Sequence, residues 1–206
     1  MQSVVRCSFL EWGKGFIFSI DGTGNRKKRD VVLLTTYDGR SGQVAHQEVQ
    51  IDDVREQART LELNLLMIPL YPGTNYLDRL ELGLRLQQAR RPIHRVAFGD
   101  LHLEHVRSWR ETHLGPALQQ LGLQAHFPLW QRAYEELKRD FFSSGANAVI
   151  SAVASDHLAS THVGQDFTPD WLDQLPVNVD QFGENGEYHT LVRPPSGGWR
   201  LLKIGA

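Results

Sequence analysis

Short, continuous hydrophobic runs along the first 150 residues predict buried β-strands. They fall at residues 31–34, 65–68, 96–98 and 148–150. A strand with both faces covered consists of consecutive apolar residues, whereas a half-exposed strand alternates apolar and polar positions. We therefore expect a parallel sheet with helices on both of its faces.

Hydrophobic residues at helical spacing lie between these runs. Asp53 and Glu56 have the spacing of a capping box, and the residues that follow share one helical face. The predicted stripes are Val54, Ala58 and Leu61; then Leu77, Leu80 and Leu84; and then Tyr134, Leu137 and Phe141, which end at Gly145. A further helix that starts near Leu103 should break at Gly115 and Pro116, because proline removes a helical hydrogen bond.

The alternation of strands and helices predicts a doubly wound α/β fold, in which ligands bind at the carboxyl ends of the strands. The alternation is lost from about Ser155, where prolines become frequent. We expect a Rossmann-like nucleotide lobe over residues 1–125, with residues 1–30 atypical, and a smaller C-terminal lobe over residues 126–206.

Composition excludes several classes of protein. The chain has 206 residues, of which 41% are hydrophobic and 22% charged, as in ordinary globular proteins. Its net charge of −2 gives no reason to expect nucleic acid or an anionic membrane as a partner. No apolar run is long enough for a membrane span, and no signal peptide is predicted. The single cysteine, Cys7, excludes an internal disulfide, so we expect a cytoplasmic protein.

One polar constellation follows the third predicted strand. Gly99 allows a ligand to approach the backbone, and Asp100 lies where such a sheet opens to ligands. Asp100 and Glu104 are candidates for orienting a nucleotide, holding Mg²⁺ or transferring protons. An equally weighted alternative makes Asp100 the N-cap of the next helix. His102 and His105 lack a metal-binding signature and are interpreted as solvated, so no metal site is predicted.

A second constellation is segment 183–190, which reads GENGEYHT. Its two glycines permit a tight loop in which Glu184, Glu187 and His189 point into one space. The carboxylates can bind an amine or ammonium or help position a metal, and His189 can move protons near neutral pH. The alternative is a solvated polar loop, because loops of this composition are common.

Several segments, taken in order, resemble the diphthine–ammonia ligase (diphthamide synthetase) family of PP-loop ATPases. They read LLTTYD at 33–38, VAFGD at 96–100 with Glu104 and Arg107 following, FPLW at 127–130, and GENGEYHT at 183–190. The last motif is the most specific, and the resemblance runs from about Val31 to the C-terminus. It implies a Rossmann-like nucleotide lobe of the adenine nucleotide α-hydrolase type and a smaller C-terminal lobe.

The resemblance also implies a reaction. ATP adenylates a carboxylate, ammonia attacks the adenylate to give an amide, and Mg²⁺ neutralises phosphate charge. Members of the family from eukaryotes and archaea act on a modified histidine of a translation elongation factor. The implied partners are thus ATP, ammonia and a carboxylate-bearing substrate, such as a protein side chain, while the oligomeric state stays open.

We assign the candidate residues on this basis. The catalytic candidates are Asp100, Glu184, Glu187 and His189. The nucleotide-binding candidates are Leu34, Thr35, Thr36, Gly99 and Asp100, with the strand at 34–36 beside the adenine. The substrate-binding candidates are Glu104, Asn185 and Thr190.

One departure from the family is large. The family's first strand leads into a Ser-Gly-Gly-Lys-Asp-Ser loop that wraps the ATP phosphates, whereas residues 9–16 here read FLEWGKGF. Residues 12–15 do not match a Walker loop either, and the basic run at 26–29 is interpreted as a solvated turn. Loss of the loop predicts poor ATP binding. The alternatives are a noncatalytic nucleotide- or ligand-binding protein of the same fold and a metal-dependent hydrolase.

The genetic code permits an explanation for this departure. Codons that start at the second base of those for residues 10–16 can encode Trp-Ser-Gly-Gly-Lys-Asp-Ser, which is the missing motif in its expected place. We hypothesise that residues 1–30 carry a shifted reading frame that is restored before Val31. The nucleotide sequence around codons 9–31 tests this hypothesis.

Overall fold

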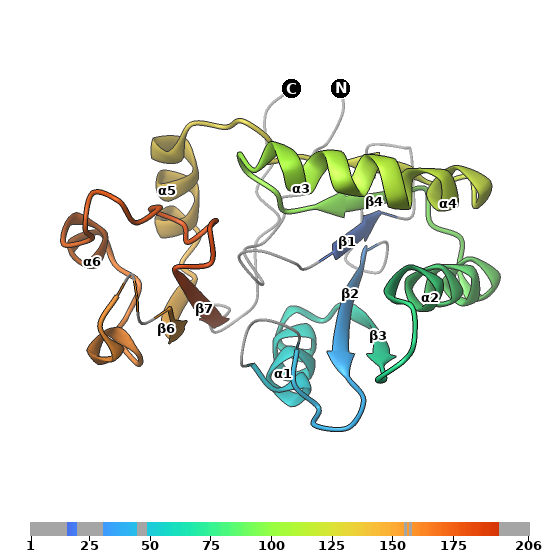
Figure 1. Ribbon diagram of the computed structural model, residues 1–206, viewed down its shortest axis with the longest axis horizontal. Coiled ribbons are helices and arrows are strands. Elements are labelled where there is room, and N and C mark those ends of the chain that lie inside the picture. Colours follow the sequence, from blue (N-terminus) through green and yellow to red (C-terminus); the bar gives the residue numbers. More distant parts are fainter. Residues whose placement is uncertain (1–15, 20–30, 45–48, 155, 157, 194–206) are drawn as a thin grey trace.

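The computed structural model describes residues 16–19, 31–44, 49–154, 156 and 158–193 (Figure 1). The larger of its two sheets has five strands in the order β3-β2-β1-β4-β5. Their bounds are β1 Phe16–Ser19, β2 Val31–Asp38, β3 Asn64–Leu70, β4 Arg95–Phe98 and β5 Gln124–His126. The predicted segment 12–15, the basic run 26–29 and Cys7 lie outside the described residues.

The expected α/β fold is observed, with one reversed strand. Strand β2 runs parallel to β3, and β4 runs parallel to β5. Strand β1 lies between these pairs and is antiparallel to both of its neighbours. The strand order is that of a doubly wound fold, but the central strand departs from the predicted all-parallel sheet. This strand falls within residues 1–30, which the sequence marks as atypical.

Both faces of the larger sheet are covered, as the continuous hydrophobic runs predict. Residues alternate across β2, so that Val31 and Leu33 enter one buried cluster while Val32 and Leu34 enter another. Helix α1 (Ile51–Leu61) contributes to the first cluster, whereas α2 (Tyr76–Arg90) and α4 (Gly115–Gln120) contribute to the second. The predicted stripe on α1 is confirmed, since Val54, Ala58 and Leu61 are all buried.

The fourth predicted strand does not join the larger sheet. Residues 148–150 belong to β6 (Asn147–Val153), which pairs with β7 (Tyr188–Arg193) in a separate antiparallel sheet. A hydrophobic run cannot by itself specify its partner, and β7 lies about 40 residues further along the chain. The buried residues of this smaller sheet share a cluster with Val31 and Leu33, so the smaller sheet packs against one face of the larger one. Helices α5 (Tyr134–Ser143) and α6 (Pro169–Asp173) complete this side of the molecule (Figure 1).

The helix near residue 103 continues through the expected break. Helix α3 (Glu104–Trp109) passes into a π-helical turn, η2 (Arg110–Leu114), and then into α4. The N–H of Gly115 donates to the carbonyl of Arg110, five residues back. Pro116 lies in the first turn of α4 and has no N–H to donate, and the π-helical turn lies immediately before this helix. The prediction that the helix breaks at Gly115 and Pro116 was therefore wrong.

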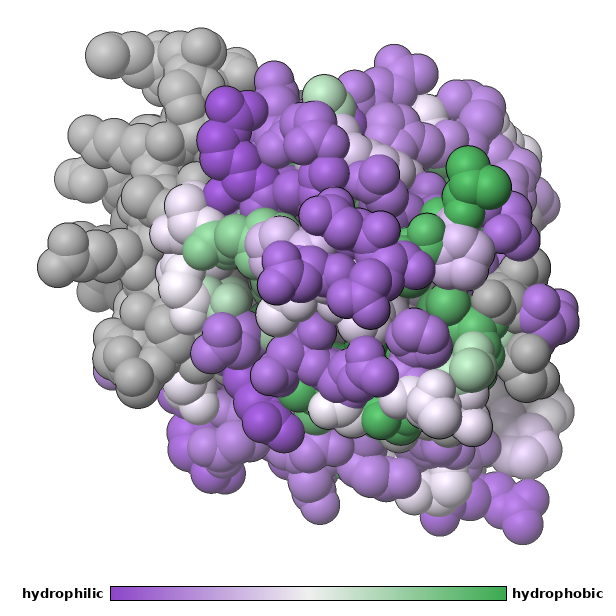
Figure 2. Space-filling view, turned by 90° about the vertical axis from the view of Figure 1, so that its left-hand side faces the viewer, coloured by the Kyte–Doolittle hydropathy of each residue, from purple (hydrophilic) through white to green (hydrophobic). Residues whose placement is uncertain are grey.

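The side of the molecule that carries the smaller sheet is largely hydrophilic, with hydrophobic residues in small separate spots (Figure 2). Within the part of the chain that the structure describes, no helix combines the length and the apolar character that crossing a membrane requires.

Candidate active site

Segment 183–190 begins in a loop that two buried or half-buried carboxylates organise. The Asp180 carboxylate accepts hydrogen bonds from the N–H groups of Phe182 (2.8 Å) and Glu184 (3.2 Å). The Glu187 carboxylate accepts from the N–H of Asp180 (2.9 Å) and from the N–H and side-chain amide of Asn185 (both 3.0 Å). The loop is therefore a fixed hydrogen-bonded turn and not the solvated loop that was the alternative.

Glu187 lies inside this turn. Its exposed fraction is 1%. Burial by itself would raise its pKa, but the hydrogen bonds from Asp180 and Asn185 outweigh burial and hold the pKa below its ordinary value. Glu187 thus stays ionised and serves as the acceptor around which the loop closes.

Glu184 connects this loop to the larger sheet. Its carboxylate oxygens accept hydrogen bonds from the N–H groups of Leu101 (3.1 Å) and His102 (2.7 Å), which follow the carboxyl end of β4. Burial raises the pKa of Glu184, the two backbone N–H groups oppose that shift, and the charges of Asp180 and Asp100 add to it. Two of the predicted constellations, which lie 82 and 83 positions apart at these bonds, therefore meet at the strand end.

Asp100 is paired inside the protein. Its two oxygens accept from Nε (2.8 Å) and Nη2 (3.1 Å) of Arg110, and both side chains are more than 90% buried. The Arg110 guanidinium also lies 4.9 Å from the centre of the Phe98 ring. This pair fixes the backbone just beyond β4, beside the bonds from Glu184. Asp100 does not act as the N-cap of α3, because that position belongs to Leu103.

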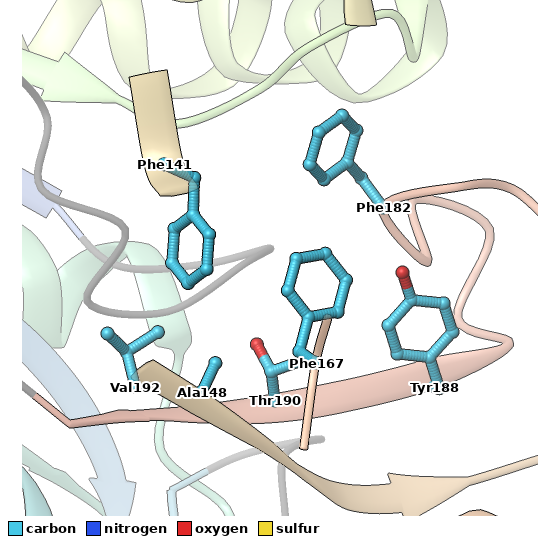
Figure 3. Close-up of a pocket in the computed structure, with 7 residues that line it drawn as sticks. All are labelled: Phe141, Ala148, Phe167, Phe182, Tyr188, Thr190 and Val192. Atoms are coloured by element: carbon cyan, nitrogen blue, oxygen red, sulfur yellow. The ribbon is translucent and has the colours of Figure 1, made fainter. Parts of the chain in front are cut away.

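The end of the segment lies on β7, where successive side chains point to opposite faces. Tyr188 and Thr190 are buried, whereas His189 between them is half-buried on the other face. Thr190 faces a cavity lined mainly by aromatic rings, including Phe141 and Phe167 (Figure 3). This cavity measures about 10 Å³, which is room for at most one water molecule. The structure therefore does not bring Thr190 and His189 into one space.

The other predicted residues are spread along the sheet. Leu34 and Thr35 are buried inside β2, which runs on to Asp38, so only Thr36 approaches the carboxyl end with a half-buried side chain. Gly99 directly follows β4 and has open space where a Cβ would lie. Glu104 is exposed at the start of α3, and Asn185 is exposed in the loop.

Sequence reasoning missed three residues that organise this region. Asp180 holds the loop, the Tyr134 hydroxyl donates to Asp180 at 2.6 Å, and Arg110 pairs with Asp100. The Asp180 carboxylate accepts a hydrogen bond from the N–H of Phe182, two residues further along, which is the pattern of an Asx turn. An aspartate that precedes a glycine-containing loop is a sequence signal for such a turn. The local sequence places Tyr134 in a core-facing stripe but indicates no hydrogen-bonding role for Tyr134 or Arg110, because their partners are distant or lie across a turn.

The carboxylates do not gather as metal ligands. Among the residues with described positions, no three histidine, cysteine, aspartate or glutamate side chains converge to hold a metal ion. The oxygens of Asp100, Glu184 and Glu187 instead accept bonds from N–H donors of the protein.

Replacing Glu187 with glutamine is expected to destabilise the protein by about 2 kcal/mol at pH 7, because the amide NH₂ would face N–H donors. The folded-state pKa of Glu187 is lowered, so its contribution is present above the ordinary value of 4.5 and is lost as the pH falls through the folded-state pKa. The difference between the wild type and Glu187→Gln should shrink in acid. Urea unfolding at several pH values measures it.

Glu135→Gln is the matched control, because Glu135 is 78% exposed on α5 and forms an exposed ion pair with Lys138. It should change stability by less than about 0.5 kcal/mol at every pH. Equal effects of the two substitutions would contradict the role assigned to Glu187.

Comparison with known proteins gives a partial similarity. The chain is 32% identical over 92 residues to the diphthine–ammonia ligase of Schizosaccharomyces pombe. The matched region covers 42% of this chain and 15% of that protein, so the chain matches only a small part of its relative. No protein-family model matches the chain. The similarity supports the resemblance to diphthine–ammonia ligases at the level of a shared segment.

Proposed function

We propose that this chain carries the carboxylate-activating site of an ATP-dependent, amide-forming ligase of the diphthine–ammonia ligase type. The observation that carries the proposal is the pair of hydrogen bonds from Leu101 and His102 to Glu184. They join the most specific motif of the family resemblance to the strand end where nucleotides bind in doubly wound folds. The identity with the yeast ligase supports the same assignment.

The proposed chemistry starts from a poor electrophile. A carboxylate resists attack until one of its oxygens becomes part of a leaving group. Attack of that oxygen on the α-phosphorus of ATP gives an acyl adenylate and releases pyrophosphate. Ammonia then attacks the acyl carbon, and the amide forms with release of AMP. Mg²⁺ would bind mainly through the ATP phosphates and would neutralise part of their charge, as at many sites where the protein provides few ligands.

Within this site we assign different roles to the four catalytic candidates. Glu184, half-buried and with a raised pKa, accepts a proton from the incoming ammonium. Glu187 and Asp100 are positioning residues, because the first closes the loop and the second fixes the backbone beyond β4. His189, on the face of β7 opposite to Thr190, transfers protons to or from the reacting groups.

The phosphate-loop motif of the resembled family is missing from the sequence. The sequence contains no Ser-Gly-Gly-Lys-Asp-Ser motif, so no loop of that type supplies backbone N–H groups and a lysine to the ATP phosphates. We therefore expect weak binding of Mg·ATP, with a Kd of about 1 mM or more, measured by equilibrium dialysis. Affinity in the micromolar range would contradict this expectation.

A variant in which Ser-Gly-Gly-Lys-Asp-Ser replaces residues 11–16 tests the proposed activity. We call it the repaired variant or the phosphate-loop variant. It should bind Mg·ATP at least about tenfold more tightly than the wild type and release pyrophosphate when a carboxylate substrate is added. Adding Glu184→Gln to this variant should remove ATP-dependent amide formation from ammonia while ATP binding persists. If the repaired variant neither binds ATP more tightly nor releases pyrophosphate, the proposal is wrong.

A noncatalytic nucleotide- or ligand-binding protein of the same fold is the second candidate. It is favoured by the same missing loop and by the internal bonds that occupy the oxygens of Asp100 and Glu187. Tighter ATP binding by the repaired variant without any pyrophosphate release would select this candidate. In the described residues, no observation favours a metal-dependent hydrolase.

A further inference from the structure

We propose that Arg107 binds an anionic oxygen group of the ligand, a phosphate or a carboxylate, at the carboxyl end of β5. The source of that group rests on the proposed ligase function, whereas the anion site itself does not. Arg107 lies on α3, and its guanidinium carbon is 4.8 Å from the ring centres of both Phe127 and Trp130. Those two residues belong to the segment that directly follows β5.

The aromatic contacts hold the guanidinium in place without using its hydrogen-bonding capacity. Contact with a ring occurs through the face of the planar group, so its N–H groups remain available in the guanidinium plane. Only Nε has a protein acceptor in the described residues, the Glu111 carboxylate at 2.9 Å. The two Nη groups, which match the two oxygens of a carboxylate or phosphate, have none there.

Comparison with Arg110 shows what a filled site of this kind looks like. The two arginines belong to one stack, since the Phe127 ring lies 5.1 Å from Phe98 and Arg110 covers Phe98. Arg110 is 8% exposed and has a two-pronged carboxylate partner in Asp100. Arg107 is 30% exposed and has a single bond to a carboxylate that is itself 48% exposed. An exposed pair of this kind contributes little, so Arg107 keeps its capacity to bind a ligand anion.

The location fits the proposed site. Arg107 lies in the helix that follows β4, and the Phe127 and Trp130 rings that it contacts follow β5. Arg107 therefore lies at the edge of the sheet where these two parallel strands end. The Asp100–Arg110 pair and the Glu184 bonds lie on the same connection after β4. A cation there complements the carboxylates of segment 183–190 and would orient a negatively charged ligand toward them.

Titration with inorganic pyrophosphate and, separately, with glutarate tests the proposal and distinguishes the two sources of the anion. The readout is the NMR signal of the Arg107 side-chain Nε–H, assigned by its absence in Arg107→Lys. We expect one of the two probes to shift this signal in a saturable manner. Arg107→Lys keeps the charge but loses the two Nη groups that match a pair of anionic oxygens. It should weaken binding of that probe about tenfold, measured by calorimetry.

Arg85→Lys is the matched control. Arg85 also pairs with a glutamate four positions away on its helix, and it is 52% exposed on α2. It should leave probe affinity unchanged. A signal that neither probe shifts, or an equal loss of affinity in both variants, would overturn the proposal. The titration needs no ATP turnover, so an anion-dependent shift of the Arg107 signal would support the anion site even if the ligase proposal failed. Conversely, ligase activity together with an Arg107 signal that neither probe shifts would refute the anion site alone.

Discussion

Replacing Asp100 with alanine is expected to lower the free energy of unfolding by about 3–5 kcal/mol. The substitution leaves the Arg110 guanidinium, which is 8% exposed, without its carboxylate partner. Removing one member of a buried ion pair costs far more than the intact pair contributes. The loss would be a large share of the stability of a domain of this size, and urea unfolding at neutral pH measures it.

The double variant Asp100→Leu with Arg110→Met is the control, because it removes both charges and keeps apolar volume. It should recover most of the lost stability. The double variant also separates the two roles of Asp100, which are to pair with Arg110 and to fix the backbone beyond β4. If Asp100 positions that backbone, the double substitution should lower the activity of the phosphate-loop variant even though stability recovers. A loss below about 1 kcal/mol in Asp100→Ala would show that the pair does not have the structural weight assigned to it.

Gly183→Ala is expected to cost about 2–4 kcal/mol and to disorganise the loop that holds Glu184. Gly183 has φ +64°, a conformation that L side chains rarely adopt. A Cβ there would also lie 2.6 Å from the backbone carbonyl oxygen of Tyr188, which begins β7 and cannot move freely. The two costs add, so stability and Glu184-dependent activity should fall together.

Gly186→Ala separates strain from collision. Gly186 has φ +87°, but nothing lies within 4 Å of the position of its Cβ. This substitution should cost only about 1 kcal/mol, which is the conformational part alone. Equal unfolding free energies for the two alanine variants would mean that the contact with Tyr188 does not constrain the loop.

Local sequence patterns predicted the elements of the fold well. The runs at 31–34, 65–68 and 96–98 all lie in strands of the larger sheet, and the stripes on α1, α2 and α5 face the core. These predictions succeeded because burial on one or both faces imposes a repeat that the sequence must show. The end of α5 was also readable, since Gly145 has φ +76° just after Ser144, the last capping residue.

Pairing and direction were not readable from the same patterns. Residues 148–150 form β6 beside β7, although their run resembles those of the larger sheet. Strand β1 runs antiparallel to β2 and β4, and nothing in its own four residues indicates this direction. Strand partners depend on long-range contacts, and a hydrophobic strand can satisfy its backbone beside several neighbours.

The candidate site divides in the same way. Sequence identified the chemically dense segment 183–190 and the Gly99–Asp100 strand end, but it treated Asp100, Glu184, Glu187 and His189 as one group facing a cleft. The structure joins Glu184 to the strand end, commits Glu187 and Asp100 to internal partners, and separates His189 from Thr190 across β7. The roles proposed for them differ accordingly.

The sequence by itself determined the α/β class, the covered faces of the sheet, the residues rich in acid–base chemistry and the loss of the phosphate-loop motif. Each of these follows from residue type and short-range spacing, which act within a few positions of the chain. Only the tertiary structure decided which carboxylates are paired and which remain near the strand ends, because Arg110, Asp180 and Tyr134 reach their partners through packing. The side chains that satisfy a buried charge are chosen by proximity in space, and segment 183–190 gains its connection to the sheet through Glu184 for that reason.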